Sequence, residues 1–582
     1  MDNQRNMILA IVLSVIVLVG WTTLSSHFFP TANPPATKIE DGKEKVVPNP
    51  GADPAADSPA AIRNRGIVLK ESPRIVIETP QLAGSINLKG ARIDDLVLTG
   101  YRETIKKDSP PIRLLSPGGA PDAYFAGFGW SGDGVAVPGA DTLWTANGDK
   151  LTPSTPVTLL WNNPTGQIFT VRIAIDERYM FSIEQTVTNR GNAPVAIKPY
   201  ALVSRVGVSK DPSSATIHVG PIGAFGGAAN YDVSYDNLDG KESGFFAKVF
   251  GNRAVPGTNA FKTTGGWIGF GDKYWLAALV PNQHDPIDAA FRGAEGGRYQ
   301  AQISYAPNVV VSGKSLKVTQ HFFAGAKEVS TLDGYEDSLG ISQFDKAIDW
   351  GWFYWFERPI FWVLDNLFRL IGNFGVAIIC LTLIVRGLMF PIAQKQFKSM
   401  AAMRVVQPKM KALQEKYKND KPKLQQEMLA LYQSEKVNPL AGCLPMFLQI
   451  PVFYALYKVL MLSIEMRHQP FVLWIKDLSA PDPLTPINLF GLLPFEPPHM
   501  LHLGILPILL GITMYLQFKL NPQPMDDAQK QVFAIMPWVL MFVMAPFAAG
   551  LQLYWVVSNT LTIAQQKWLY SRHPALKEAP AK

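Results

Sequence analysis

The 582-residue sequence is too long for a single hydrophobic core and predicts several domains. Its net charge of +7 is modest for that length, and no Lys/Arg-rich run is interleaved with aromatic residues, so the composition argues against direct nucleic-acid recognition. Apolar residues gather at the N-terminus and after about residue 362, whereas the middle has the composition of a soluble protein. Membrane and aqueous parts are therefore expected to alternate along the chain.

The first apolar segment, 7–24, has 18 residues and no charge. As a helix it would be roughly 27 Å long, close to the ~30 Å hydrocarbon core of a bilayer. A cleaved secretory signal is the alternative, but the following Ser25-Ser-His-Phe-Phe-Pro does not resemble a typical cleavage site. We therefore predict an uncleaved anchor behind a cytoplasmic N-terminus, 1–6, followed by a Pro/Ala-rich linker over 25–65.

The segment 66–339 contains short runs in which apolar and polar residues alternate, such as Arg74-Ile-Val-Ile-Glu. Alternation bounded by turn residues predicts β-strands, and many strands without helices between them predict a large all-β antiparallel sandwich. The glycine-rich stretch Gly220-Pro-Ile-Gly-Ala-Phe-Gly-Gly lacks the strand-then-helix setting of a phosphate loop, so we interpret it as turns. No metal-ligand spacing or nucleophile motif stands out here, although a carbohydrate-binding cleft remains an alternative.

Residues 340–371 combine the aromatic run Trp350-Gly-Trp-Phe-Tyr-Trp-Phe with an apolar pattern that carries Asp365 and Arg369. Tryptophan and tyrosine prefer the boundary between membrane and water, so this pattern predicts an amphipathic helix lying at that interface. A plain juxtamembrane connector is the alternative.

The rest of the chain alternates apolar segments with polar loops. With the first anchor, the five apolar segments that follow make six predicted spans. The predicted segments are transmembrane 372–392, a cytoplasmic helical hairpin 393–439, transmembrane 440–462, a periplasmic loop 463–499, transmembrane 500–518, a cytoplasmic loop 519–531, transmembrane 532–547 and 549–568, and a cytoplasmic tail 569–582.

Orientation follows from the charges of the loops. Between Lys395 and Lys436 there are ten Lys/Arg and four Asp/Glu, whereas 463–499 has two Lys/Arg and four Asp/Glu. Because positive loops stay in the cytoplasm, both termini are predicted inside and the β-domain outside, in the periplasm of a bacterium with two membranes. Lys458, close to the outer end of its span, is expected to snorkel outward.

The cytoplasmic loop has its own helical pattern. Met400, Met403, Val406, Met410 and Leu413 follow a heptad-like spacing, which is interrupted at Asn419, Asp420 and Pro422 before a second apolar face. This predicts an antiparallel helical hairpin, kinked at Pro408. It is either a solvated spacer or a docking surface for a partner or an incoming chain.

Arg386 is a charged residue inside the predicted span 372–392. It lies nine residues before Lys395, about 13 Å deeper along a helix and close to half the ~30 Å hydrocarbon core. An arginine at this depth costs at least ~2.5–3.5 kcal/mol, so it usually faces a bundle interior or a water-filled cavity. The five C-terminal spans contain no acidic residue, which favours water around Arg386.

Other polar residues are distributed over the same spans. They either line that cavity or form interhelical hydrogen bonds. They are Thr382, Gln449, Gln517, Gln552, Ser558, Asn559 and Gln565.

Four motifs resemble the YidC family of membrane protein insertases. They are Val385-Arg-Gly-Leu-Met-Phe-Pro, Glu435-Lys-Val-Asn-Pro-Leu-Ala-Gly-Cys-Leu-Pro, Gln449-Ile-Pro-Val-Phe-Tyr-Ala-Leu-Tyr and Leu553-Tyr-Trp-Val-Val-Ser-Asn. The resemblance extends from about residue 350 to the C-terminus. The anchor, linker and outer β-domain resemble the Gram-negative members by architecture.

The resemblance implies a five-helix core around a hydrophilic groove that is open to the cytoplasm and to lipid but closed toward the periplasm. In that family Arg386 would meet the hydrophilic flank of a client, while client apolar segments would slide past Ile450 and Pro451. The groove residues implied are Arg386, Thr382, Gln449, Gln552, Tyr554 and Trp555; many members carry tyrosine in place of Trp555. The outer domain would be a β-supersandwich that resembles sugar mutarotases, without enzymatic activity.

The resemblance also implies the partners: nascent membrane proteins, the Sec translocon beside which the family works as insertase and folding chaperone, and membrane lipids. The ribosome and signal recognition components are further candidates. No cofactor or metal is expected, and no nucleotide-binding motif is found. A client that leaves the groove for lipid gains about 25 cal/mol per Å² of apolar burial, which can drive insertion.

Two other classes of function are weighed against the insertase. A secondary transporter for anionic solutes would also need a buried arginine, but it typically has internal repeats and more spans. An anchored envelope enzyme or sugar-binding protein would place its function in 66–339.

Overall fold

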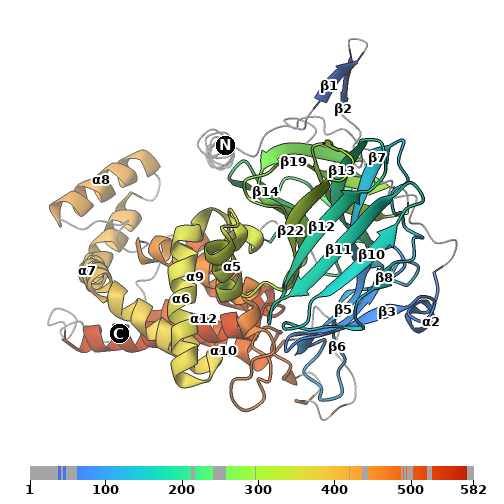
Figure 1. Ribbon diagram of the computed structural model, residues 1–582. Helices are drawn as coiled ribbons and strands as arrows, with labels where there is room; N and C mark the ends of the chain where they lie inside the picture. The colour runs from blue at the N-terminus through green and yellow to red at the C-terminus, as the bar shows by residue number, and fades with distance from the viewer. Residues whose placement is uncertain are drawn as a thin grey trace. The chain divides into compact units, whose positions relative to one another are not determined.

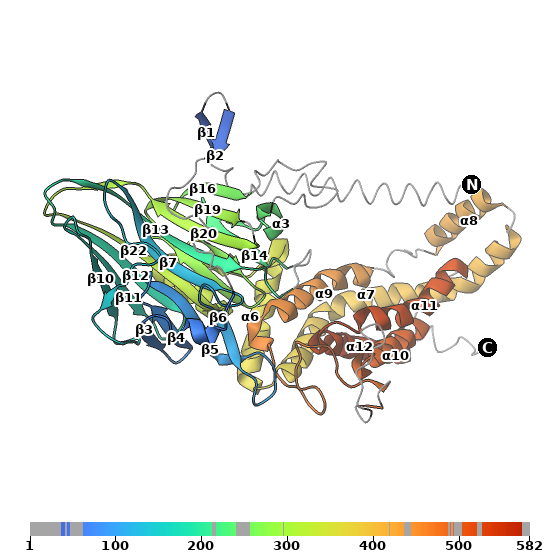
Figure 2. The same ribbon diagram turned by 90° about the vertical axis from the view of Figure 1, so that its right-hand side faces the viewer.

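The computed structural model describes residues 37–40, 43–46, 62–211, 217–239, 257–294, 296–417, 420–435, 444–486, 489–490, 493, 503–520 and 527–572. The chain divides into two units, Met1–Asp349 and Trp350–Lys582 (Figures 1 and 2). The predicted anchor over 7–24 and most of the linker lie outside the described residues. Each unit is considered by itself.

In its described part, the first unit consists of strands with three short α-helices and one 3-10 helix, Phe344–Ala347. Its α-helices are α2 (Arg65–Val68), α3 (Tyr235–Leu238) and α5 (Val329–Leu339). Its strands are β1 (Thr37–Glu40), β2 (Lys43–Val46), β3 (Arg74–Glu78), β4 (Leu82–Asn87), β5 (Arg92–Arg102), β6 (Pro111–Leu115), β7 (Tyr124–Asp133), β8 (Thr145–Ala146), β9 (Lys150–Leu151), β10 (Val157–Asn162), β11 (Gln167–Ile175), β12 (Met180–Asn189), β13 (Val195–Val206), β14 (Gly220–Phe225), β15 (Ala228–Asn230), β16 (Thr258–Thr264), β17 (Trp267–Gly271), β18 (Trp275–Val280), β19 (Pro286–Ala294), β20 (Arg298–Tyr305), β21 (Asn308–Val310) and β22 (Ser315–Ala326).

Apart from β1 and β2, which pair with each other, these strands build two large sheets. One has the order β15-β14-β17-β18-β22-β12-β11-β10-β8, and the other has the order β16-β19-β20-β13-β7-β5-β4-β3-β9. Figure 1 shows β10, β11 and β12 side by side in the first sheet. Between named strands of the two sheets every pairing is antiparallel except that of β3 with β9. The prediction of a large all-β sandwich is confirmed.

Aromatic side chains fill the space between the two sheets. The Trp130 ring on β7 meets the Phe169 ring on β11 edge-on at 5.2 Å, and the Trp144 ring stacks on Trp130. Gln185 on β12 donates its Nε2 hydrogen to the Gly129 carbonyl of β7 at 2.8 Å. Alternation along β11 and β12 directs every second side chain into this layer, as the sequence pattern predicts.

The prediction that Gly220–Gly227 forms turns is wrong for its first six residues. Gly220–Phe225 is the fully buried strand β14, and only Gly226 and Gly227 turn the chain. A Cβ on Gly223 would approach the Trp267 carbonyl oxygen to 2.7 Å, so glycine allows β14 and β17 to pack closely.

Two histidines of this unit are expected to make its stability depend on pH. Burial lowers the pKa of His218 and of His321 below their usual range near 6.5. The unfolded chain then binds protons that the folded chain does not, so stability is lost as pH falls from about 6.5 toward the lowered folded values. We expect the melting temperature of this unit to be lower at pH 5.5 than at pH 7.5 by calorimetry. The double variant His218→Gln/His321→Gln should lose less on acidification, and an equal loss would contradict this cause.

The second unit is helical. Its helices are α6 (Tyr354–Ile371), α7 (Phe374–Lys416), α8 (Lys421–Ser434), α9 (Leu444–Leu462), α10 (Ile505–Leu520), α11 (Asp527–Met544) and α12 (Ala549–Arg572). In the described part of the chain, Phe374–Gln394 is the one helical segment both long and apolar enough to cross a membrane by length and composition. Gln449–Leu462, Ile505–Leu520 and Gln531–Met544 are shorter apolar helices.

Helix α7 continues beyond its apolar part, and Figure 2 shows it extending past α10 and α12 toward α8. Val406 and Met410 of α7 are buried against Leu431 and Tyr432 of α8. Lys409 Nζ lies 2.5 Å from a carboxylate oxygen of Glu435. These four residues of the predicted apolar faces therefore pack against each other, and Pro408 lies inside a helix that runs to Lys416.

Helix α6 has the two faces of an amphipathic helix. Ile360, Phe361 and Leu364 are buried, whereas Trp355 and Trp362 are exposed. Of the helix predicted over 340–371, only Tyr354–Ile371 is an α-helix with a tryptophan-bearing face, and Phe344–Ala347 and Gly351–Phe353 are short 3-10 helices. The place of α6 at a membrane interface stays a prediction.

Candidate functional site

Arg386 lies in the middle of the apolar part of α7. Its guanidinium Nε donates to the hydroxyl oxygen of Ser558 on α12 at 3.2 Å, and its Nη2 contacts the same oxygen. No carboxylate among the described residues forms an ion pair with Arg386. The positive charge is therefore held by a neutral hydroxyl, which leaves donors of the guanidinium available for an anionic or polar group.

Tyr554 extends this contact to a third helix. It lies one helical turn before Ser558 on α12, and its hydroxyl accepts a hydrogen bond from Gln449 Nε2 of α9 at 2.5 Å. Arg386, Ser558, Tyr554 and Gln449 form a polar centre, which brings together α7, α12 and α9.

Two of the residues next to the polar centre present apolar surface. Ile450 follows Gln449 on α9 and is 56% exposed, and Pro451 is half-buried. The ring of Trp555 lies 4.7 Å from the ring of Phe453, again between α12 and α9. One turn of α9 thus carries a polar side chain toward the polar centre and an exposed aliphatic one beside it.

Thr382 and Gln552 have other partners. The Thr382 hydroxyl is buried and donates to the Ile378 carbonyl of its own helix at 2.7 Å. Gln552 is fully buried and its Nε2 donates to the carbonyls of Met544 and Phe547, each at 2.8 Å, at the end of α11. Gln552 thus satisfies the carbonyl of the last residue of α11 and one in the connection to α12, neither of which has a partner within a helix.

The sequence placed Ser558 among the residues that either line a cavity or bond between helices, but it did not predict that Ser558 contacts Arg386. The available signal was the spacing of Tyr554 and Ser558, which places both side chains on one face of α12. Asn559 lies on a neighbouring face and donates to the Thr513 hydroxyl of α10 at 3.3 Å. It forms the interhelical bond that was the alternative to a cavity-lining role.

The expectation that Lys458 snorkels outward is wrong. Its residue is 1% exposed on α9, which packs against α6, where Glu357 is also buried. A buried lysine needs polar partners. The Lys458 side chain therefore lies inside the helical bundle and does not reach water.

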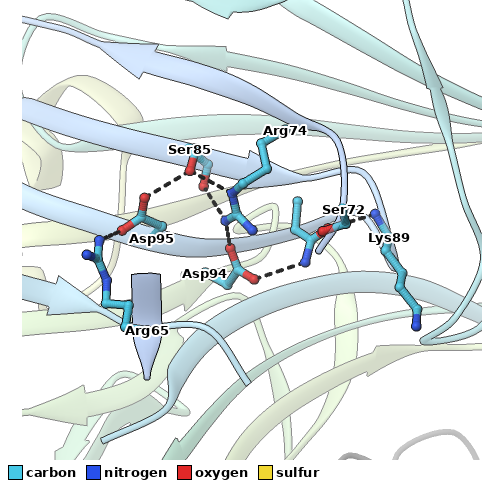
Figure 3. A network of polar contacts seen from close by, with 8 residues as sticks. Arg65, Ser72, Arg74, Ser85, Lys89, Asp94 and Asp95 are labelled. Atoms are coloured by element: carbon cyan, nitrogen blue, oxygen red, sulfur yellow. Dashed lines mark hydrogen bonds and ion pairs between the residues drawn. The ribbon is translucent and has the colours of Figure 1, made fainter. Parts of the chain in front are cut away.

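A second charged group lies in the β-domain, and Figure 3 shows it at β3, β4 and β5. Arg74 pairs with Asp94, Arg65 pairs with Asp95, and Ser85 donates to Asp95 at 2.9 Å. Burial raises the pKa of Asp94, although Arg74 opposes this shift. Each carboxylate is paired with an arginine, so the group connects α2 to the sheet. Among the described residues, no His, Cys, Asp or Glu cluster is arranged to hold a metal ion.

Comparison with known proteins covers both units. Residues 74–363 match the family model described as the YidC periplasmic domain, and residues 366–577 match the one described as 60Kd inner membrane protein. A membrane protein insertase YidC of Zymomonas mobilis is 50% identical, with 99% of this chain and 96% of that protein covered. The chain belongs to the YidC family.

Further relatives agree with this family. YidC insertases of a Methylobacterium species and of Rhizobium johnstonii are each 45% identical, with 98% of this chain and 96% of each relative covered. A solved YidC insertase with its first transmembrane domain resolved aligns with 95% of this chain and 98% of that one, at 17% identity and a TM-score of 0.36. The family is one of inner-membrane proteins with a periplasmic domain and is not a family of enzymes.

Proposed function

We propose that this chain is a membrane protein insertase in which the polar centre around Arg386 receives the hydrophilic flank of a client. The observation that carries the proposal is a guanidinium inside an apolar helix held by the hydroxyl of Ser558, with no carboxylate partner among the described residues. Such a group attracts the acidic or polar part of a polypeptide that must cross the bilayer.

The apolar part of the client has a matching surface. Ile450 is exposed beside Gln449, which reaches the polar centre through Tyr554. A client can therefore keep its polar flank at Arg386 while its apolar segment contacts α9 and then passes into lipid. The groove assigned to Arg386, Gln449, Tyr554 and Trp555 is part of this proposal, and Thr382 and Gln552 would support it through the backbone bonds described above.

The membrane arrangement is proposed with it. It has six spans, both termini and the α7–α8 pair in the cytoplasm, and the β-domain in the periplasm, as the loop charges favour. The chain would act alone or with the Sec translocon, as insertase and chaperone. The exposed charges of the α7–α8 pair favour an aqueous site where a ribosome or another partner can dock.

A deletion separates this function from the alternative that places activity in the β-domain. Replacing 66–339 by a short flexible linker should preserve insertion of a client into proteoliposomes, measured by protease protection of its translocated flank. The full chain is the positive control, and vesicles without protein are the negative control. Complete loss of insertion in a variant that is stably membrane-embedded would favour the β-domain as the site of function.

A further inference from the structure

The segment 463–486, called the lid here, connects the end of α9 to residues that precede α10. Helices α7, α10 and α12 all begin against it, and the first amides of a helix have no partners within that helix. The lid supplies such partners to α12, because the Ala549 and Gly550 amides donate to the carbonyls of Ala480 and Leu478 at 2.8 and 2.9 Å.

The lid also holds the start of α7. The Asn373 side-chain oxygen accepts from the Val376 amide at 3.1 Å, which caps α7. The Asn373 Nδ2 donates to the Phe471 carbonyl of the lid at 3.2 Å. A Cβ on Gly375 would overlap the Phe471 ring, so glycine lets the lid pack directly on this helix.

Asp482 connects the lid to α10. It is 1% exposed, and its Oδ2 accepts from the Leu506 amide in the first turn of α10 at 2.7 Å. Its Oδ1 accepts from Trp474 Nε1 at 2.9 Å and from the Leu484 amide at 3.1 Å, both within the lid. A carboxylate at this position is also stabilised by the helix dipole.

Apolar packing closes the space below these bonds. Met466 and Leu478 of the lid are fully buried, and Ile378 of α7 is fully buried one turn below the start of that helix. A Cβ added at Gly550 would contact Ile378 of α7 and Leu478 and Met466 of the lid at 3.3 to 3.4 Å. The start of α12 therefore packs directly against both α7 and the lid.

We propose that Asp482 is the latch that holds the lid over this end of the bundle, the end that the resemblance to the YidC family implies is closed. The inference rests on the proposed function, because a hydrated polar centre at Arg386 would conduct ions if the opposite end were open. Ile378 lies eight residues from Arg386, about 12 Å along α7, so the sealed layer is thin. Asp482 is a positioning residue in this account and does not contact the client.

A buried thiol can report on the seal. The parent chain would carry Ile378→Cys, with Cys380 and Cys443 changed to serine. A membrane-impermeant maleimide is added on the side of the β-domain, and the labelled fraction is followed with time. We expect the parent to be protected and Asp482→Ala to react roughly tenfold faster, because charge-assisted hydrogen bonds that hold the lid are lost. Asp482→Asn should react at an intermediate rate, since its amide oxygen can still accept from Leu506.

Asp477 provides a matched control within the lid. Its carboxylate accepts from the Ser479 amide at 2.8 Å and from the Ser479 hydroxyl at 2.6 Å, within the lid itself. Asp477→Ala should therefore label as slowly as the parent. Equal labelling of the parent, Asp482→Asn and Asp482→Ala would overturn the latch.

Two readouts keep the result independent of protein yield and of the proposed function. If Asp482→Ala does not give folded protein, Trp474→Phe removes one of the three bonds and should increase labelling by a smaller factor, with no increase counting against the latch. Labelling reports on the lid alone, whereas a failure of the proposed function would appear as absent client insertion by the wild-type chain.

Discussion

Arg386→Ala is expected to slow the insertion of clients with an acidic translocated flank on the order of tenfold. Hydrogen bonds to a charged group contribute about 1.5–3 kcal/mol, and about 1.4 kcal/mol corresponds to a factor of ten in rate. Clients with a neutral flank should be affected less, because they gain less from the positive charge. Insertion rates of a matched client pair into proteoliposomes measure the difference.

The conservative variant separates charge from geometry. Arg386→Lys keeps a positive charge but not the fork that reaches Ser558, so it should retain part of the preference for the acidic client. If Arg386→Ala inserted both clients at the wild-type rate, Arg386 would not be the contact that receives the flank.

Trp130→Ala is expected to destabilise the β-domain by roughly 3–5 kcal/mol, the range for removing a large buried aromatic side chain. Trp130 is 2% exposed and contacts both Trp144 and Phe169 between the two sheets. The unfolding transition of the full chain, followed by calorimetry, should show a lower melting temperature for this domain.

A surface position serves as the control for Trp130. Val309 on β21 is 70% exposed, so Val309→Ala should leave the transition within about 0.5 kcal/mol of wild type. A Trp130→Ala variant with the same transition as Val309→Ala would contradict the packing described for the sandwich.

The all-β domain could be predicted from the sequence because one face of each strand is buried. That burial imposes a period of two, as in β11 and β12. The same reasoning failed at β14, where all six residues are buried and four of the eight residues of the stretch are glycine. No alternation remains in such a strand, and glycine is selected there by the close approach of β17 rather than by a turn.

The depth of Arg386 could also be predicted, because helix rise alone converts residue spacing into distance. The partner of Arg386 could not be predicted, because the sequence shows several hydroxyl and amide residues in these apolar helices and does not show which of them faces Arg386. Ser558 meets Arg386, Gln552 binds helix-end carbonyls, and Asn559 bonds to Thr513. All three residues lie on α12, so only their positions around and along that helix distinguish these roles.

Lys458 shows the same limit for a charged residue. Its position near the end of a span suggested that its ammonium reaches water, but the residue is only 1% exposed on α9, a helix that packs against α6. Packing between helices that are distant in sequence is not visible in the hydropathy of either one.

Crosslinking from α9 tests the central claim most directly. A photoreactive side chain at Ile450 should crosslink to the apolar segment of a stalled nascent membrane protein. The same probe at Ile512 on α10, an isoleucine 41% exposed, should give much less adduct with that client. Probes at Ser558 should crosslink to its hydrophilic flank. The account predicts this division of the client between the two positions, and the absence of client adducts at both Ile450 and Ser558 would contradict it.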